Sequence, residues 1–127
     1  GLGAAVDWIQ AVGIDQIRAH EEALVADAIE RLSSEVPGLS IHGPLGIGDR
    51  GALVSFSLEG AHPHDIGEIL GRSGVCVRAG HHCAQPLMRR LGVGATTRAS
   101  FAVHNTVSDT ARLIEGLGEV RRTLQLD

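Results

Sequence analysis

The chain has 127 residues, a formal net charge of −4 and 43% hydrophobic residues, values that are ordinary for one globular domain spanning 1–127. The net negative charge argues against nucleic acid as a main partner, because phosphate binding requires a basic surface. No apolar run approaches the roughly 20 residues that cross a bilayer, so we expect no membrane segment.

The first third of the chain has helical patterns. Residues 4–12 are mostly apolar, and Gly13 interrupts them. Residues 14–36 then carry an apolar stripe at spacings of three, four or seven, which is typical of an amphipathic helix. The stripe consists of Ile14, Ile17, Leu24, Ala28, Leu32 and Val36. Pro37-Gly38 ends this helix, and residues 39–42 form a short strand candidate.

The remaining segments alternate between strand and helix patterns. Residues 52–58 have period-two alternation, and residues 75–78 and 98–104 are also predicted as strands. Pro63 favours a helix start after His62, and the spacing from Thr106 to Asp109 is that of a capping box. These elements predict an α+β fold, in which a small, mostly antiparallel sheet has helices packed on one face.

One segment places a cysteine among basic residues. Cys83 follows His81 and His82, and Arg78 lies shortly before them. Cationic neighbours lower the pKa of a thiol, and the thiolate is the nucleophile. Glycine before the histidines and proline after the cysteine indicate a loop, so we interpret Cys83 as a reactive thiol and not as a buried apolar residue. Cys76 lies between two valines in a predicted strand and is expected to pack inside the protein.

The Cys83 segment resembles the cysteine loop of the SufS-like (group II) cysteine desulfurases, in the class-V aminotransferase family. The matching elements are Arg78-x-Gly-His-His-Cys-Ala-x-Pro-Leu-Met88, Arg98-Ala-Ser-Phe101 and Asn105-Thr106. The resemblance implies the small C-terminal domain of a fold-type I pyridoxal-phosphate enzyme. The chain begins Gly1-Leu-Gly3 and its only methionine is Met88. We therefore expect a C-terminal piece of a longer two-domain protein.

The resemblance also implies a reaction. In it, Cys83 takes sulfur from L-cysteine bound to pyridoxal phosphate (PLP), which yields L-alanine, a persulfide and sulfur for iron–sulfur cluster assembly. Arg98 would bind the substrate carboxylate, a role that suits its planar fork. Arg78 would lend positive potential or orient the loop, and His81 and His82 would tune the thiol or hold the loop. The family further implies a homodimeric parent and a SufE- or SufU-like sulfur acceptor, and the two dissimilar cysteines favour a reducing, cytoplasmic compartment.

The chain contains no lysine. PLP is held by lysine as a Schiff base, so we expect this chain alone to bind no cofactor and to be inactive. Three alternatives remain open: a stand-alone persulfide carrier or interaction module, a selenocysteine lyase with the same residues, or a class-V relative that uses no thiol. A metal site and a Cys-His hydrolase are disfavoured, because neither the ligand spacing of zinc nor an orienting acid can be recognised.

Overall fold

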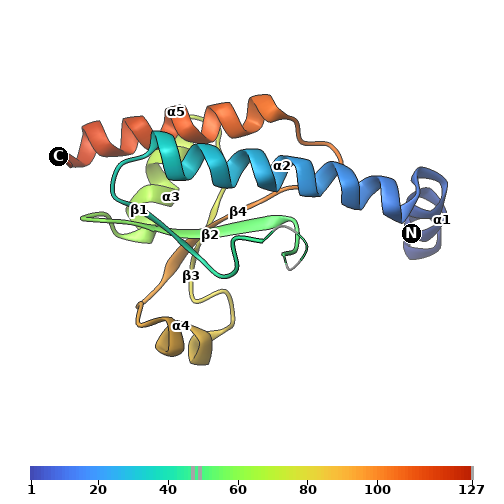
Figure 1. The fold of residues 1–127 in the computed structure, drawn as a ribbon, viewed down its shortest axis with the longest axis horizontal. Helices are drawn as coiled ribbons and strands as arrows, with labels where there is room; N and C mark the ends of the chain where they lie inside the picture. The colour runs from blue at the N-terminus through green and yellow to red at the C-terminus, as the bar shows by residue number, and fades with distance from the viewer. Residues whose placement is uncertain (47, 49, 127) are drawn as a thin grey trace.

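In the part of the chain that the structure describes, four antiparallel strands form one sheet in the order β1-β2-β4-β3 (Figure 1). This computed structural model describes residues 1–46, 48 and 50–126. The strands are β1 Leu39–His42, β2 Leu53–Leu58, β3 Arg78–Gly80 and β4 Thr96–Ser100. The helices are α1 Leu2–Val12, α2 Ile14–Glu35, α3 Pro63–Arg72, α4 Gln85–Leu91 and α5 Val107–Leu124.

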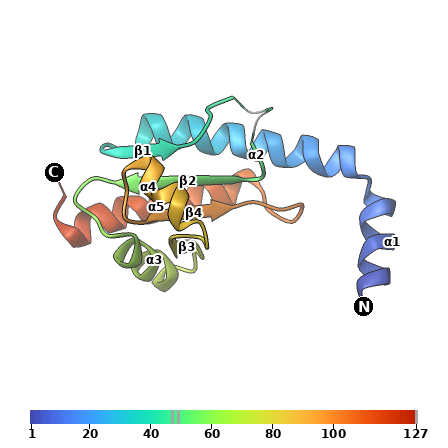
Figure 2. The ribbon, with the colours of Figure 1, turned by 90° about the horizontal axis from the view of Figure 1, so that it is seen from below.

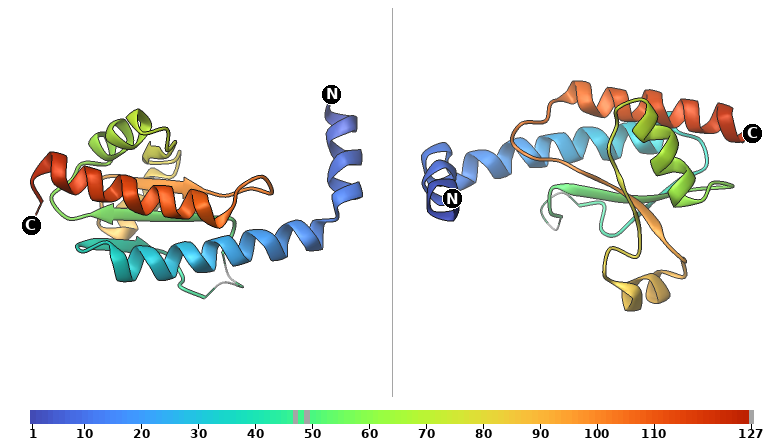
Figure 3. Two further views of the ribbon diagram at one scale, coloured as in Figure 1. Left: turned by 90° about the horizontal axis from the view of Figure 1, so that it is seen from above. Right: turned by 180° about the vertical axis from the view of Figure 1, so that it is seen from behind.

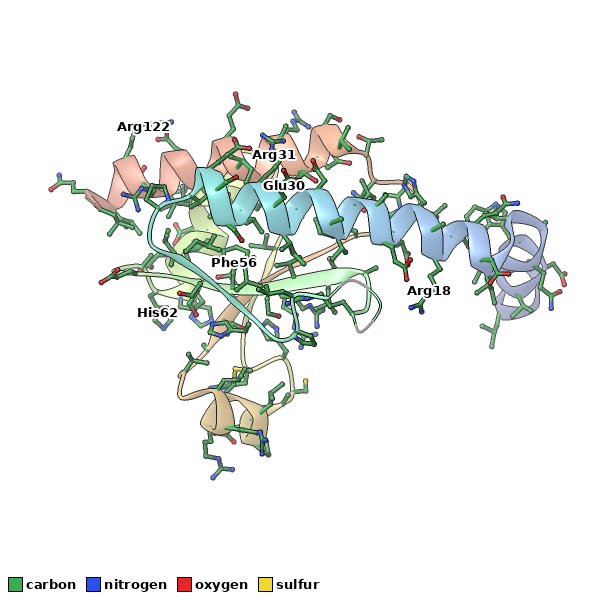
Figure 4. The ribbon with its side chains drawn as sticks, in the orientation of Figure 1. Arg18, Glu30, Arg31, Phe56, His62 and Arg122 are labelled. Carbon is green, nitrogen blue, oxygen red and sulfur yellow. The ribbon has the colours of Figure 1, made fainter. Side chains whose placement is uncertain are left out.

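Helices α2, α3 and α5 form the core with one face of the sheet, and Figure 1 shows α2 and α5 on the opposite side of the sheet from α4. Alternation along β2 turns Val54, Phe56 and Leu58 toward these helices, where all three are buried. Phe56, labelled in Figure 4, lies between β2 and the helical layer. The predicted α+β architecture is confirmed, and one face of the sheet stays free of the three long helices.

The N-terminal helix α1 extends away from the rest of the molecule (Figures 2 and 3). None of its residues is buried, although it is mostly apolar and exposes Leu2, Val6 and Trp8. The break after α1 falls at Gly13, which has a φ of 93°. This backbone conformation is unfavourable for residues that carry a Cβ atom. The predicted interruption at this glycine is confirmed.

Two helix starts follow the predicted capping chemistry. His62 is the N-cap of α3, where its Nδ1 accepts a hydrogen bond from the backbone N–H of His64 at 3.3 Å, and Pro63 follows it. At the start of α5, the Asp109 carboxylate accepts a hydrogen bond from the Thr106 N–H at 2.9 Å, as one half of a capping box. Both starts were recognisable because capping involves neighbours in the chain.

The predicted strand over residues 98–104 is too long. β4 ends at Ser100, because the Asn105 side chain accepts a hydrogen bond from the Ala102 N–H at 2.9 Å and turns the chain. The predicted strand over residues 75–78 is also misplaced, since β3 begins only at Arg78.

Helix α4 was not predicted. Its signals were nevertheless present in the sequence: Pro86 lies in its first turn, and Gly92 ends it in the left-handed conformation with φ 71°.

Candidate functional site

Two arginines face each other on the sheet face that the long helices leave free. The strand register pairs Arg78 of β3 with Arg98 of β4, and Arg98 with Ser55 of β2, so all three side chains project from that face. Like charges directly opposite each other are unfavourable. Within the described residues neither arginine has an ion pair with a carboxylate, and Arg98 Nε is buried without a hydrogen-bond partner. The pair is therefore suited to binding an anion.

Cys83 lies in a tight turn between β3 and α4. The Ala84 N–H donates a hydrogen bond to the His81 carbonyl at 2.8 Å, which closes a four-residue turn. The two central residues, His82 and Cys83, have φ of 55° and 60°. Positive φ at both central positions defines a type I′ turn, which normally contains Asn or Gly because a Cβ is unfavourable there. The predicted loop is present, and its backbone is strained at the cysteine.

The turn brings the thiol to Arg78. Arg78 Nη2 donates a hydrogen bond to Cys83 Sγ at 3.5 Å, and both side chains are exposed. The contact places the guanidinium group of Arg78 directly beside an accessible sulfur atom. The contact therefore provides both the charge and the access that a nucleophilic cysteine requires.

His82 connects the turn to β4. Its Nε2 forms a hydrogen bond with the Thr96 hydroxyl at 2.8 Å, while its buried Nδ1 has no partner within the described residues. Burial lowers the pKa of His82, and the positive charge of Arg98 lowers it further. Both effects favour the neutral imidazole over its charged form.

The two adjacent histidines have different surroundings. His81 is exposed, and its side chain makes no hydrogen bond in the part of the chain that the structure describes. His82 is half-buried against β4. Of the two histidines expected to tune the thiol or hold the loop, His82 is the one with a structural contact.

Two hollows meet at His82. One, of about 480 Å³, lies between α4 and the sheet; Arg98 and His82 line it together with apolar residues that include Leu87 and Met88. The other, of about 560 Å³, is more open and contains Arg78, His82 and Cys83. Cys83 and Arg98 therefore lie in adjoining hollows that share His82, which is compatible with one ligand that contacts both.

Arg50 was given no role from the sequence, yet it supports the wall of the larger hollow. Its guanidinium donates to the backbone carbonyls of His42 at 2.8 Å and Leu53 at 3.2 Å, and also to that of Pro44. Burial lowers the pKa of Arg50. The sequence showed an arginine in a glycine-rich connection. It could not show the partners of this arginine, because they are backbone carbonyl groups that no sequence motif marks.

The prediction for Cys76 is wrong. Cys76 is exposed, and residues 75–77 precede β3 and belong to none of the described strands. It lines a separate hollow of about 240 Å³ with Asn105 and Arg112. Both cysteines are free thiols.

The residues of this chain do not fit PLP. The cofactor is bound through a Schiff base to lysine, and the chain has none. No group of three or more His, Cys, Asp or Glu side chains that could hold a metal ion occurs among the described residues. Among the helices that are described, none is long and apolar enough to span a bilayer.

The chain matches a known family over most of its length. The sequence profile of the family Aminotransferase class-V matches residues 1–113. The chain therefore belongs to the class-V aminotransferase family.

Within that family the chain is similar to cysteine desulfurases. It is 50% identical over 121 residues to "Probable cysteine desulfurase" of Streptomyces coelicolor, which covers 95% of this chain and 29% of that protein. It is also 50% identical to "Probable cysteine desulfurase 2" of Mycobacterium leprae, over 92% of this chain and 28% of the relative. The crystal structure of the cysteine desulfurase CsdA from Escherichia coli superposes with a TM-score of 0.88 at 33% identity, over 96% of this chain and 29% of that one. The chain thus spans less than a third of the length of these relatives.

Proposed function

We propose that this chain provides the sulfur-accepting thiol and the substrate-carboxylate site of a SufS-like (group II) cysteine desulfurase. The observation that carries the proposal is the hydrogen bond of 3.5 Å from Arg78 to Cys83 Sγ. Arg98 lies directly opposite Arg78 and has no carboxylate partner among the residues that the structure describes. The names of relatives that are 50% identical support the same activity. The substrate would be L-cysteine.

Each residue has a defined task in this reaction. The Arg98 guanidinium binds the substrate carboxylate with two parallel hydrogen bonds. The Cys83 thiolate attacks the substrate sulfur, so that an S–S bond forms and the substrate C–S bond breaks. The carbon keeps the electron pair and takes up a proton. L-cysteine plus the Cys83 thiol thus gives L-alanine plus a Cys83 persulfide, and the atoms balance. No lysine of this chain can bind PLP, so the cofactor pocket belongs to another part of the parent protein.

The exposed turn suits transfer of the sulfur onward. A persulfide on Cys83 would be accessible to the thiol of a separate acceptor, which we propose is a SufE- or SufU-like protein serving iron–sulfur cluster assembly. The free thiols are compatible with a reducing, cytoplasmic compartment. By family resemblance the parent would act as a homodimer.

The test compares two cysteine variants of the complete parent protein. Cys83→Ser is expected to abolish alanine release and the mass increase of one sulfur atom on the Cys83 peptide. Cys76→Ser is the matched control, because Cys76 is also an exposed free thiol, and it should retain both. Undiminished alanine release by Cys83→Ser would contradict the proposal.

A persulfide carrier remains the second candidate, because a chain without lysine has the composition that a carrier would show. Reading the coding sequence upstream of Gly1 separates the two candidates. A continuous reading frame with a large domain and a Schiff-base lysine would favour the desulfurase. A selenocysteine lyase would use the same residues, and comparing turnover of L-cysteine with that of L-selenocysteine distinguishes it.

A further inference from the structure

Two adjacent threonines of β4 differ in their hydrogen bonding. Thr96 and Thr97 are both fully buried. The Thr96 hydroxyl forms a hydrogen bond with His82 Nε2 at 2.8 Å, whereas Thr97 Oγ1 has no partner in the described part of the chain. Alternation explains the difference: Thr97 pairs with Phe56 and shares its helix-covered face, while Thr96 shares the opposite face with Arg98.

We propose that Thr96 is a positioning residue for Cys83. Its hydroxyl holds the His82 ring, and the main chain of the turn then holds the thiol beside Arg78. The inference rests on the proposed function of Cys83 as a nucleophile, but its own evidence is the contact between Thr96 and His82.

The strand register explains why Thr96 can act on the turn. Thr96 pairs with Gly80, the last residue of β3, and the turn begins at the next residue. The hydrogen bond from His82 therefore ties the turn to the strand that also carries Arg98. It fixes the thiol relative to both Arg78 and Arg98.

The conformation of the turn depends on the hydrogen bond between His82 and Thr96. His82 and Cys83 both adopt left-handed conformations, which are unfavourable for residues with a Cβ. One backbone hydrogen bond, from Ala84 to His81, closes the turn. The His82 ring has no second hydrogen bond within the described residues, because Nδ1 is buried without a partner. Loss of the Thr96 hydroxyl would leave both ring nitrogens unsatisfied and remove the restraint on the turn.

The experiment measures alkylation of Cys83 by iodoacetamide in the full chain, with Cys76→Ser as background so that one thiol reacts. Thr96→Val keeps the shape of the side chain and removes the hydroxyl. We expect it to slow alkylation by about three- to tenfold, because a loosened turn separates the sulfur from the Arg78 guanidinium that contacts it at 3.5 Å. Since Cys83 is already exposed, loosening the turn should add little to the access of iodoacetamide to the sulfur.

Two matched variants separate positioning from packing. Thr96→Ser keeps the hydroxyl and should restore most of the rate. Thr97→Val removes, at the adjacent buried position, a hydroxyl that has no partner among the described residues, and it should leave the rate unchanged. Nitrogen chemical shifts of the His82 ring, measured by NMR, should change in Thr96→Val and not in Thr97→Val.

Specific outcomes overturn the inference. A wild-type alkylation rate in Thr96→Val with changed His82 shifts would show that the hydrogen bond does not position the thiol. Equal slowing by Thr97→Val would show a general packing effect. If Thr96→Val does not fold, His82→Leu removes the same hydrogen bond from the less buried partner, and it must slow alkylation to support the inference. The assay uses no cysteine substrate, so it gives its answer even if the parent protein releases no alanine.

Discussion

The strained turn at Cys83 predicts an unusual order of stability among variants. A residue with a Cβ in the left-handed conformation is disfavoured by about 1–2 kcal/mol, and glycine avoids this cost. However, glycine loses more backbone entropy on folding than alanine does, which costs roughly 0.5–1 kcal/mol. With φ of 60° at Cys83, we therefore expect Cys83→Gly to be more stable than Cys83→Ala by about 0.75 kcal/mol, the difference between the midpoints of these two costs.

Cys76 provides the matched control for this prediction. It is also an exposed free cysteine, but its φ is not positive. At position 76 the order should reverse, and alanine should be more stable than glycine by about 0.4–1 kcal/mol. Urea and thermal unfolding of the four variants, followed by circular dichroism, would measure the differences, which correspond to about 2–4 °C in Tm at position 83. If Cys83→Ala matches or exceeds Cys83→Gly in stability, the turn is not strained at the thiol.

Further predictions concern packing in α5 and the ionisation of His82. A Cβ at Gly116 would lie 2.5 Å from Leu70 Cδ2 in the core, so Gly116→Ala should destabilise the chain by about 1–2 kcal/mol in urea unfolding. Gly118 has only ordinary contacts, so Gly118→Ala should instead stabilise the helix by up to about 1 kcal/mol; equal effects would contradict the contact at Gly116. The pKa of His82 is lowered by burial and by Arg98. The contribution of the neutral His82 ring to the stability of the folded chain is therefore complete above pH ~6.5, and it is lost as the pH falls through the folded-state pKa. An NMR titration midpoint at or above the ordinary histidine value would exclude this arrangement.

Two features of the candidate site lower the stability of this domain. Arg78 and Arg98 repel each other across two strands, and the adjacent turn holds two residues with positive φ. Both features reduce stability in the absence of a ligand. An anion bound between the guanidinium groups would relieve the repulsion, so a bound carboxylate should raise the Tm of the chain.

Sequence patterns alone identified the elements that local rules determine. Period-two alternation marked β2, the apolar stripe marked α2, and Thr106 with Asp109 marked the start of α5. The cysteine loop was also recognisable, because the glycine before the histidines and the proline after the cysteine both disfavour a continuous helix or strand. These signals depend on neighbours in the chain, so they can be read without knowledge of the fold.

Only the tertiary structure decided how the site is assembled. The sheet order places β4 between β2 and β3, and this register brings Arg98 opposite Arg78 and Thr96 beside the turn. Nothing in the sequence indicated that His82, and not His81, would contact β4. Strand order and register depend on the packing of segments far apart in the chain, whereas periodicity and capping are local. The candidate nucleophile could therefore be proposed from the sequence, but the residues that hold it could be found only from the fold.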